Sequence, residues 1–326
     1  MTDPDHIDGA ELVGPSIPES AVPGVVVRAH GKFYEVQEIG GDRTFLAELR
    51  GSIKRYRQKT GIVAVGDRVL VTELDDGEGR IESVLPRRSV LQRPGRGPAG
   101  TQQVILANPD QALFMFSVAQ PDPHRRMLDR FLILSEATGV PALIGINKLD
   151  LDSDDDPSHR PPAHAMFEDY QVIYPVFYFS AKHRIGLDPV ADGLHGKLTV
   201  IAGPSGVGKS SLLNALDPGG DRAIQAISDS TGKGRHTTTS AQIYRLGPDT
   251  FVADTPGMRA LAMSSIVPEV LDQYFPEFRP MLGSCFYADC KHLSEPGCAV
   301  IEAVERGEIP VGRYQSYCAL RTGVPD

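Results

Sequence analysis

Short apolar stretches separated by polar turns characterise the first part of the chain. Five of them are rich in Val, Ile, Phe and Tyr and end at Gly or Asp turns; they cover residues 25–30, 33–38, 44–49, 68–73 and 80–85. Five short strands at this spacing are typical of a small closed β-barrel. We expect an OB-type barrel, with an SH3-like barrel as the alternative.

A different pattern follows residues 93–100, which are rich in Gly and Pro and which we interpret as a linker. Residues 112–118 form an uninterrupted apolar run, as a strand buried on both faces requires. Residues 127–138 carry apolar side chains at helical spacing. Further apolar strands are expected at 142–146, 175–179, 198–202 and 251–253. Strands alternating with helices predict an α/β domain with a mostly parallel sheet.

The two ends of the chain differ from its middle. Residues 1–23 are polar and acidic, and we expect them to form a disordered tail. After residue 265 the strand pattern stops, and all four cysteines lie beyond that point. The prediction is a multi-domain protein, since 326 residues exceed one typical core. Its parts are the tail 1–23, the barrel 24–98, the α/β domain 99–264 and a small, mainly helical domain 265–326.

Composition narrows the class of protein. The chain is 41% hydrophobic and 23% charged, with no apolar run long enough to cross a membrane. The N-terminus lacks the basic and apolar segments of a secretory signal, so the cytoplasm is the expected compartment. A net charge of −9 argues against a protein that coats nucleic acid with its whole surface.

Basic residues are nevertheless in excess in the barrel region. Residues 24–98 contain 14 lysines and arginines against 10 aspartates and glutamates. Basic side chains around an aromatic one suit contact with phosphates and stacking on bases. Such a cluster consists of Lys54, Arg55, Tyr56, Arg57 and Lys59. We expect an RNA-facing patch here, with a solvated face of the barrel as the alternative.

A strand, a Gly-rich loop and a helix start follow one another at residues 198–211. Gly203, Gly208, Lys209 and Ser210 fit the phosphate-loop pattern G-x-x-x-x-G-K-[ST]. Backbone N–H groups of such a loop surround phosphates, Lys209 can neutralise the β- and γ-phosphate oxygens, and the Ser210 hydroxyl can ligate Mg²⁺. The residues expected to contact the nucleotide here are Gly203, Pro204, Ser205, Gly206, Val207, Gly208, Lys209, Ser210 and Ser211.

Two short motifs at strand ends favour guanine as the base. In the N-K-x-D motif, the Asp150 carboxylate can accept hydrogen bonds from guanine N1 and N2. Adenine lacks this donor pair, and discrimination of this kind can reach about 10⁴-fold. In the S-A-K motif, the Ala181 N–H can reach guanine O6. The residues expected around the base are Asn147, Lys148, Asp150, Ser180, Ala181 and Lys182. A P-loop kinase or ATPase is the enzymatic alternative.

The sequence Asp-Thr-Pro-Gly at 254–257 follows the last expected strand. Asp254 can hold Mg²⁺ through water, and the Gly257 N–H can contact the γ-phosphate. A polar, Gly-rich stretch lies between this motif and the phosphate loop. We expect one of its threonines to ligate Mg²⁺ in the triphosphate state, with Thr238 as the first choice and Thr237 as the second.

The order of the motifs is circularly permuted. GTPases usually run P-loop, switch threonine, D-x-x-G, N-K-x-D, S-A-K, whereas N-K-x-D and S-A-K come first here. Such a permutation preserves a site if the new ends lie in surface connections. Met258 stands where many GTPases have a glutamine that orients the attacking water. We therefore expect slow hydrolysis by the free enzyme, with His236 as the candidate for orienting water and an anchoring role as the alternative.

Three cysteines and a histidine are closely spaced near the C-terminus, as Cys285-x₄-Cys290-x-His292-x₅-Cys298. Thiolates and a neutral imidazole form closed, tetrahedral Zn²⁺ sites, so we expect one structural zinc ion. Free or buried thiols and a disulfide are the alternatives. We expect Cys318, in a helical-looking stretch, to be a packing residue.

Taken together, these residues resemble a known family. In chain order the motifs are NKLD, SAK, GPSGVGKSS, GKGRHTTT, DTPGMR and CFYADCKHLSEPGCAV. They are similar to those of the circularly permuted, ribosome small-subunit-dependent GTPases, and the likeness covers about residues 24–317. The acidic tail and the loop 154–162 depart from the family pattern.

The resemblance implies an OB domain, a permuted GTPase domain and a zinc domain, with GTP or GDP, Mg²⁺ and one Zn²⁺ as cofactors. It also implies that a monomeric protein binds the 30S subunit and its 16S rRNA late in assembly, and that the subunit stimulates GTP hydrolysis. A non-catalytic rRNA-binding scaffold that merely holds nucleotide is the alternative outside the enzymes.

Overall fold

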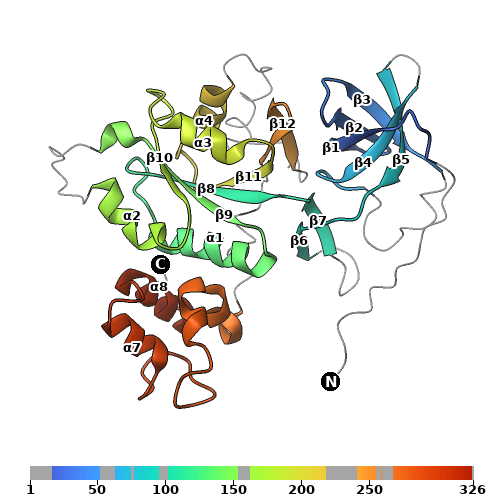
Figure 1. The fold of residues 1–326 in the computed structure, drawn as a ribbon. Coiled ribbons are helices and arrows are strands. Elements are labelled where there is room, and N and C mark those ends of the chain that lie inside the picture. The colour runs from blue at the N-terminus through green and yellow to red at the C-terminus, as the bar shows by residue number, and fades with distance from the viewer. Residues whose placement is uncertain are drawn as a thin grey trace.

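The chain folds into an N-terminal barrel, a central α/β domain and a helical C-terminal lobe (Figure 1). The computed structural model describes residues 17–51, 63–74, 77–94, 102–152, 162–217, 241–254, 258 and 267–324. Some of the sequence predictions concern residues outside these ranges: the tail up to residue 16, the basic cluster 54–59, most of the loop 154–162, the threonine-rich stretch 232–240 and Gly257.

Five strands close into the barrel in the order β1-β2-β3-β5-β4. They are β1 (Val22–His30), β2 (Phe33–Glu38), β3 (Thr44–Leu49), β4 (Arg68–Glu73) and β5 (Glu78–Val84). The β3–β5 pair is parallel and the other four pairs are antiparallel. Apolar side chains from all five strands, such as Val26, Phe45 and Ile81, fill the interior. The predicted OB-type barrel is confirmed.

The central domain is built on a six-stranded sheet in the order β10-β9-β8-β11-β13-β12. Its strands are β8 (Gln111–Ser117), β9 (Ala142–Asn147), β10 (Val176–Tyr178), β11 (Leu198–Ala202), β12 (Gln242–Gly247) and β13 (Thr250–Asp254). All neighbours pair in parallel except β12, which lies antiparallel to β13 at one edge. The predicted mostly parallel sheet is therefore confirmed, whereas β12 was not predicted.

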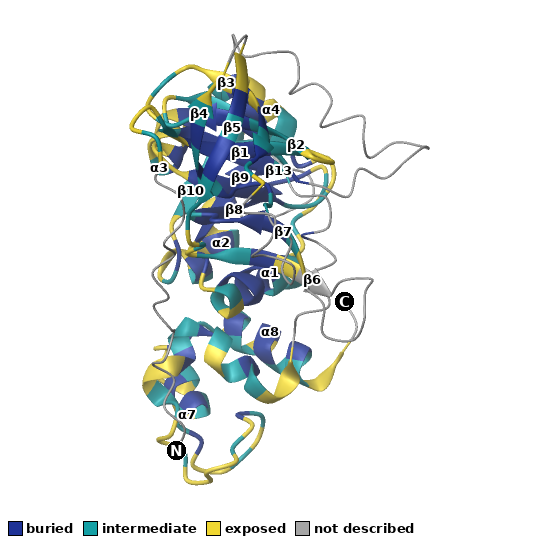
Figure 2. Ribbon diagram, turned by 90° about the vertical axis from the view of Figure 1, so that its right-hand side faces the viewer, coloured by how far each residue is buried: buried dark blue, intermediate teal, exposed yellow. Residues whose placement is uncertain are grey.

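Helices cover both faces of this sheet. The helices α1 (Arg125–Thr138) and α2 (Ala163–Gln171) share a core with Phe114 and Phe116 of β8. On the opposite face, α3 (Leu187–Leu194) and α4 (Lys209–Leu216) pack with Leu113 and Met115. Successive strand residues point to opposite faces, so a strand with helices on both sides must be apolar at every position. Figure 2 shows the resulting buried sheet between its helices.

A hairpin of β6 (Val90–Pro94) and β7 (Gln102–Ala107) connects the barrel to the sheet. It was not predicted, and β6 extends to the Pro94 that we interpreted as part of a linker. At the barrel end, the Ala107 N–H donates to the Val65 carbonyl oxygen (2.8 Å), and Asn108 Nδ2 donates to that of Gly66 (3.1 Å). A Cβ at Gly66 would lie 2.0 Å from the Ala107 oxygen, so this close approach requires glycine.

Residues 267–324 form the C-terminal lobe and contain helices without strands, as predicted. The helices are η5 (Pro268–Tyr274), η6 (Pro276–Met281), α7 (Ala299–Glu305) and α8 (Val311–Thr322). The lobe lies against α1, whose Ile133 belongs to the apolar core of the lobe (Figure 2). Cys318 of α8 packs against the same core, as predicted.

A buried ion cluster accompanies this apolar contact. Arg313 of α8, 1% exposed, pairs with Asp129 of α1 and with Glu277 of η6, where Nε and Oε1 lie 2.7 Å apart. Ser316 donates a hydrogen bond to the same Asp129 carboxylate. None of the helices in the described part of the chain has the length and apolarity that a membrane span needs.

Candidate nucleotide site and metal centre

The phosphate loop connects the end of β11 at Ala202 to the start of α4 at Lys209. Within it, Gly203, Gly206 and Gly208 adopt φ values of +154°, +82° and +94°. A Cβ on Gly203 would lie 2.1 Å from the Met115 carbonyl oxygen, and one on Gly208 would lie 2.3 Å from Asn147 Nδ2. Glycine is therefore required at both ends of the loop, where the motif has it.

Lys209 and Asp254 interact electrostatically near this loop. Lys209 Nζ donates to the carbonyl oxygens of Gly203 (3.0 Å) and Pro204 (2.9 Å). Asp254 ends β13, level with Ile201 of β11. Burial lowers the pKa of the Lys209 ammonium and raises the pKa of the Asp254 carboxyl, and each charge partly offsets the shift of the other. An anionic phosphate near Lys209 and a cation near Asp254 would favour both charged forms.

Asn147 links the base motifs to the phosphate loop. It is the last residue of β9 and is buried. Its Oδ1 accepts a hydrogen bond from the Ala181 N–H (3.0 Å), and its Nδ2 donates to the Val207 carbonyl oxygen (2.8 Å). One side chain thus fixes the S-A-K segment and the phosphate loop relative to each other. Because Asn147 engages the Ala181 N–H here, the expected contact of Ala181 with guanine O6 stays a prediction.

The remaining base-motif residues lie around the same strand ends. Lys148 has a φ of +64°, and its ammonium donates to the Gln120 carbonyl oxygen. Asp150 lies in the short helix η3 (Leu149–Leu151), and its Oδ1 accepts a hydrogen bond from Ser180 Oγ (2.6 Å). Lys182 is exposed. N-K-x-D and S-A-K, 30 residues apart in the chain, therefore meet through side-chain contacts.

The two switch motifs are only partly described. Asp254 and Met258 lie within the described residues, and Met258 is buried in the large core that β8, α1 and α2 share. A buried thioether cannot orient an attacking water. His236, Thr237, Thr238 and Gly257 lie outside the described residues, and their expected roles stay predictions.

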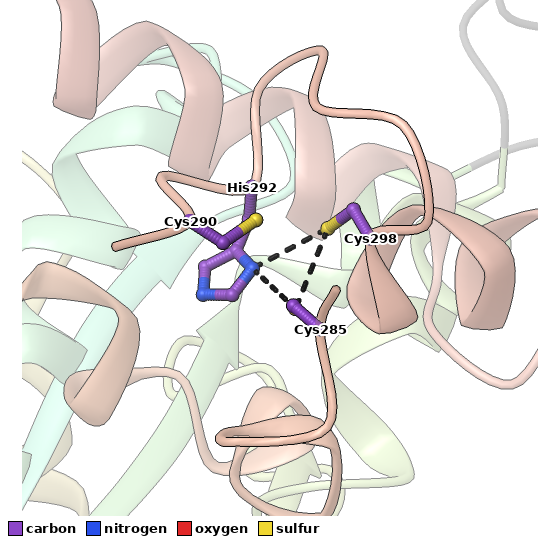
Figure 3. Close-up of side chains that lie close together, drawn as sticks. All are labelled: Cys285, Cys290, His292 and Cys298. Atoms are coloured by element: carbon purple, nitrogen blue, oxygen red, sulfur yellow. Dashed lines mark hydrogen bonds between the residues drawn. The ribbon is translucent and has the colours of Figure 1, made fainter. Parts of the chain in front are cut away.

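The predicted zinc ligands form one cluster (Figure 3). Donor atoms of Cys285, Cys290, His292 and Cys298 all lie within 4.8 Å of one another. His292 Nδ1 lies 3.5 Å from Cys285 Sγ and 3.4 Å from Cys298 Sγ, and these two sulfurs are 3.9 Å apart. Around a tetrahedral Zn²⁺ with ordinary bond lengths, a ligand nitrogen and a ligand sulfur would lie about 3.6 Å apart, and two ligand sulfurs would lie about 3.8 Å apart. All four cysteines are free thiols, which contradicts the disulfide alternative.

Neighbouring groups suit this cluster to a cation. The second ring nitrogen of His292, Nε2, faces Asp272 Oδ2 at 3.6 Å, the arrangement that orients a metal-bound imidazole. Burial lowers the pKa of His292, although Asp272 opposes the shift, and a neutral ring is the ligand form. Burial also raises the pKa of the Cys290 thiol to about 12. A bound Zn²⁺ would offset the cost of the buried thiolate.

Sequence reasoning did not identify the residues that shape the metal-binding loop. The Glu295 carboxylate accepts hydrogen bonds from the N–H groups of Lys291 (2.8 Å), Leu293 (2.8 Å) and Ser294 (3.0 Å). Burial alone would raise the pKa of Glu295, but these bonds hold it at about 2. The Tyr317 hydroxyl donates to the Lys291 carbonyl oxygen (2.8 Å). In the sequence, the signal for Glu295 was the position of an acidic residue between the two predicted zinc ligands His292 and Cys298.

The phosphate loop lies on a mostly parallel sheet, and Asn147 joins it to the S-A-K motif. Both the N-K-x-D and the S-A-K motif precede the loop in the chain. This combination defines a circularly permuted P-loop GTPase. The chain belongs to the RsgA GTPase family, whose model matches residues 84–264. The protein is therefore a GTPase, with a guanine nucleotide and Mg²⁺ as its cofactors.

Similarity to individual relatives extends well beyond this domain. The chain is 43% identical, over 93% of its length and 97% of the relative, to the Small ribosomal subunit biogenesis GTPase RsgA of Gemmatimonas aurantiaca. The chain is also 38% identical to the Thermotoga maritima protein of the same name, over 91% of this chain and 95% of that protein.

Two solved structures share the whole architecture. The crystal structure of YjeQ from Thermotoga maritima superposes with a TM-score of 0.75 at 35% identity, covering 93% of this chain and 98% of that one. The crystal structure of YloQ, described as a circularly permuted GTPase, superposes with a TM-score of 0.71 at 31% identity. It covers 94% of this chain and 96% of that one.

Proposed function

We propose that this GTPase acts late in the maturation of the 30S ribosomal subunit, and that the subunit stimulates its hydrolysis of GTP. The relatives named as small ribosomal subunit biogenesis GTPases align over nearly their whole length. The observation that carries the proposal is the Asn147 side chain, which holds the base motif and the phosphate loop as one site in a chain that matches these relatives over 91–93% of its length.

Each part of the site has a proposed role. Asp150 recognises the guanine edge, and the backbone of residues 203–211 surrounds the phosphates. Lys209 neutralises the β- and γ-phosphate oxygens as bond cleavage proceeds. Ser210, Thr238 and Asp254 hold the Mg²⁺, which supplies charge stabilisation to the transferring phosphoryl group. His236 orients the attacking water, the part that Met258 cannot take.

The three folded parts divide the work in this proposal. The barrel, residues 24–98, contributes to 16S rRNA binding through its basic cluster Lys54, Arg55, Arg57 and Lys59. The GTPase domain comprises residues 99–264. In the domain 265–326, one structural Zn²⁺ binds Cys285, Cys290, His292 and Cys298. The protein acts as a monomer in the cytoplasm.

Phosphate release with and without purified 30S subunits tests the function. We expect slow release from the free enzyme and a rise of at least about tenfold with subunits, because a partner must complete a site that lacks a water-orienting glutamine. ATP should not replace GTP. Nucleotide-independent 30S binding without any stimulated release would instead identify a non-catalytic scaffold.

His236→Ala tests the proposed water-orienting residue in the same assay. This variant should bind GTP and 30S subunits nearly as the wild type does and lose most of the stimulated rate, about 10²-fold. His195→Gln, a change of an exposed histidine at the end of α3, is the control. Full stimulation in His236→Ala would assign the histidine to loop anchoring.

A further inference from the structure

The carboxylate of Asp150 is contacted on both of its oxygens. Oδ1 accepts a hydrogen bond from Ser180 Oγ at 2.6 Å. Oδ2 faces Nε2 of His183 at 3.6 Å, with 17% of the Asp150 side chain and 49% of the His183 side chain exposed. The separation of 3.6 Å exceeds a direct hydrogen bond but is well within the range of an ion pair or a bridging water.

His183 also acts on the same carboxylate through its backbone. The His183 N–H donates to Ser180 Oγ at 3.2 Å. With its oxygen accepting this bond, the Ser180 hydroxyl is free to donate to Asp150. The residue that follows the S-A-K motif therefore contacts both partners of the base-recognising pair, with its backbone on Ser180 and its ring on Asp150.

We propose that His183 is a positioning residue of the guanine site, which restricts the Asp150 carboxylate through the ring contact at Oδ2 and the backbone contact with Ser180. The inference rests on the proposed role of Asp150 in recognising guanine. The N1–H and N2–H donors of guanine lie in one plane and require both carboxylate oxygens in that plane. A carboxylate anchored at one oxygen alone can still tilt, whereas contacts at both oxygens restrict it to one orientation.

Fluorescent GDP titrations at pH 8.0 test the proposal. His183→Ala should bind GDP about two- to fivefold more weakly than the wild type, since the carboxylate then lacks one contact of a partly exposed pair. His183→Gln should restore wild-type affinity, because the glutamine amide can reach Oδ2 without charge.

The controls separate this inference from the function on which it rests. His195→Ala removes an exposed histidine outside the site and should keep wild-type affinity. Wild-type affinity in His183→Ala, or affinity in His183→Gln as weak as in His183→Ala, overturns the role of His183 while leaving the guanine site intact. Equal affinity of the wild-type protein for ADP and GDP would overturn the proposed guanine site itself.

Discussion

Single residues in the base site contact two segments of the chain at once. The sequence predicted the motifs to which these residues belong, but not the contacts that they make between segments. The N-K-x-D and S-A-K motifs could be predicted because each is short and follows an apolar strand. The bracing role of Asn147 could not, since its partners Ala181 and Val207 lie 34 and 60 residues away. Likewise, the contact of His183 with Asp150 depends on how two loops meet.

Asp150→Asn tests base recognition at this scale. The amide offers one donor and one acceptor, so it suits the carbonyl of xanthine better than the two donors of guanine. We expect GTP affinity to fall at least about 10²-fold and XTP affinity to rise, while Asn Oδ1 can still accept the Ser180 bond. Competition titrations with GTP, XTP and ATP measure the change, with the exposed Asp192→Asn as control. Unaltered preference for GTP contradicts the assignment.

Among the secondary-structure elements, those with a strong local pattern were predicted and those defined by their partners were not. Strands β8 and β11 are buried throughout, so their apolar runs were unambiguous. Strand β12, with Gln242, Arg245 and Gly247, has no such run and owes its conformation to pairing with β13. The β6–β7 hairpin likewise forms because its two strands pair with each other. The end of β6, Arg93 and Pro94, belongs to the residues that we interpreted as a linker.

The metal-binding loop is an element whose stability we expect to depend on zinc. Cys298→Ser should release about one Zn²⁺ per chain and unfold residues 267–324 at lower temperature, because a structural zinc supplies folding energy locally. The change should leave GDP binding intact. Metal content by mass spectrometry and thermal unfolding measure both effects, and Cys318→Ser, outside the cluster, is the control. Stoichiometric disulfides in place of zinc in reduced protein would contradict the site.

In the described part of the molecule, the barrel and the C-terminal lobe contact the GTPase domain at different places. The barrel contacts the β12–β13 hairpin, where the Gly40 N–H donates to Asp249 Oδ1 (2.7 Å) and Arg245 pairs with Asp42 (3.0 Å). That hairpin connects the threonine-rich stretch to the D-T-P-G motif in the chain. The C-terminal lobe lies on α1 instead. The barrel therefore contacts the hairpin whose strand β13 ends at Asp254, whereas the lobe contacts the domain at a separate place, on α1 (Figure 1).

The lobe–α1 contact depends on Arg313, the largest fully buried side chain in the described part of the protein. Its guanidinium pairs with Asp129 and Glu277 and lies over the rings of Phe275 (4.6 Å) and Tyr170 (5.3 Å). Removing one partner from a buried ion cluster leaves the others without compensation, at a cost of about 3–5 kcal/mol. Arg313→Ala should therefore destabilise the protein by about this amount.

Urea denaturation monitored by circular dichroism measures this loss, and two further variants identify its cause. Arg313→Met fills most of the volume but leaves both carboxylates unpaired, so it should be nearly as destabilised as Arg313→Ala. Asp129→Asn keeps the Glu277 pair and a Ser316 partner, and should cost clearly less. Arg306→Ala, an exposed arginine paired with Glu308, should leave the unfolding midpoint unchanged. A full recovery in Arg313→Met would show that Arg313 stabilises the contact by packing and not by its charge.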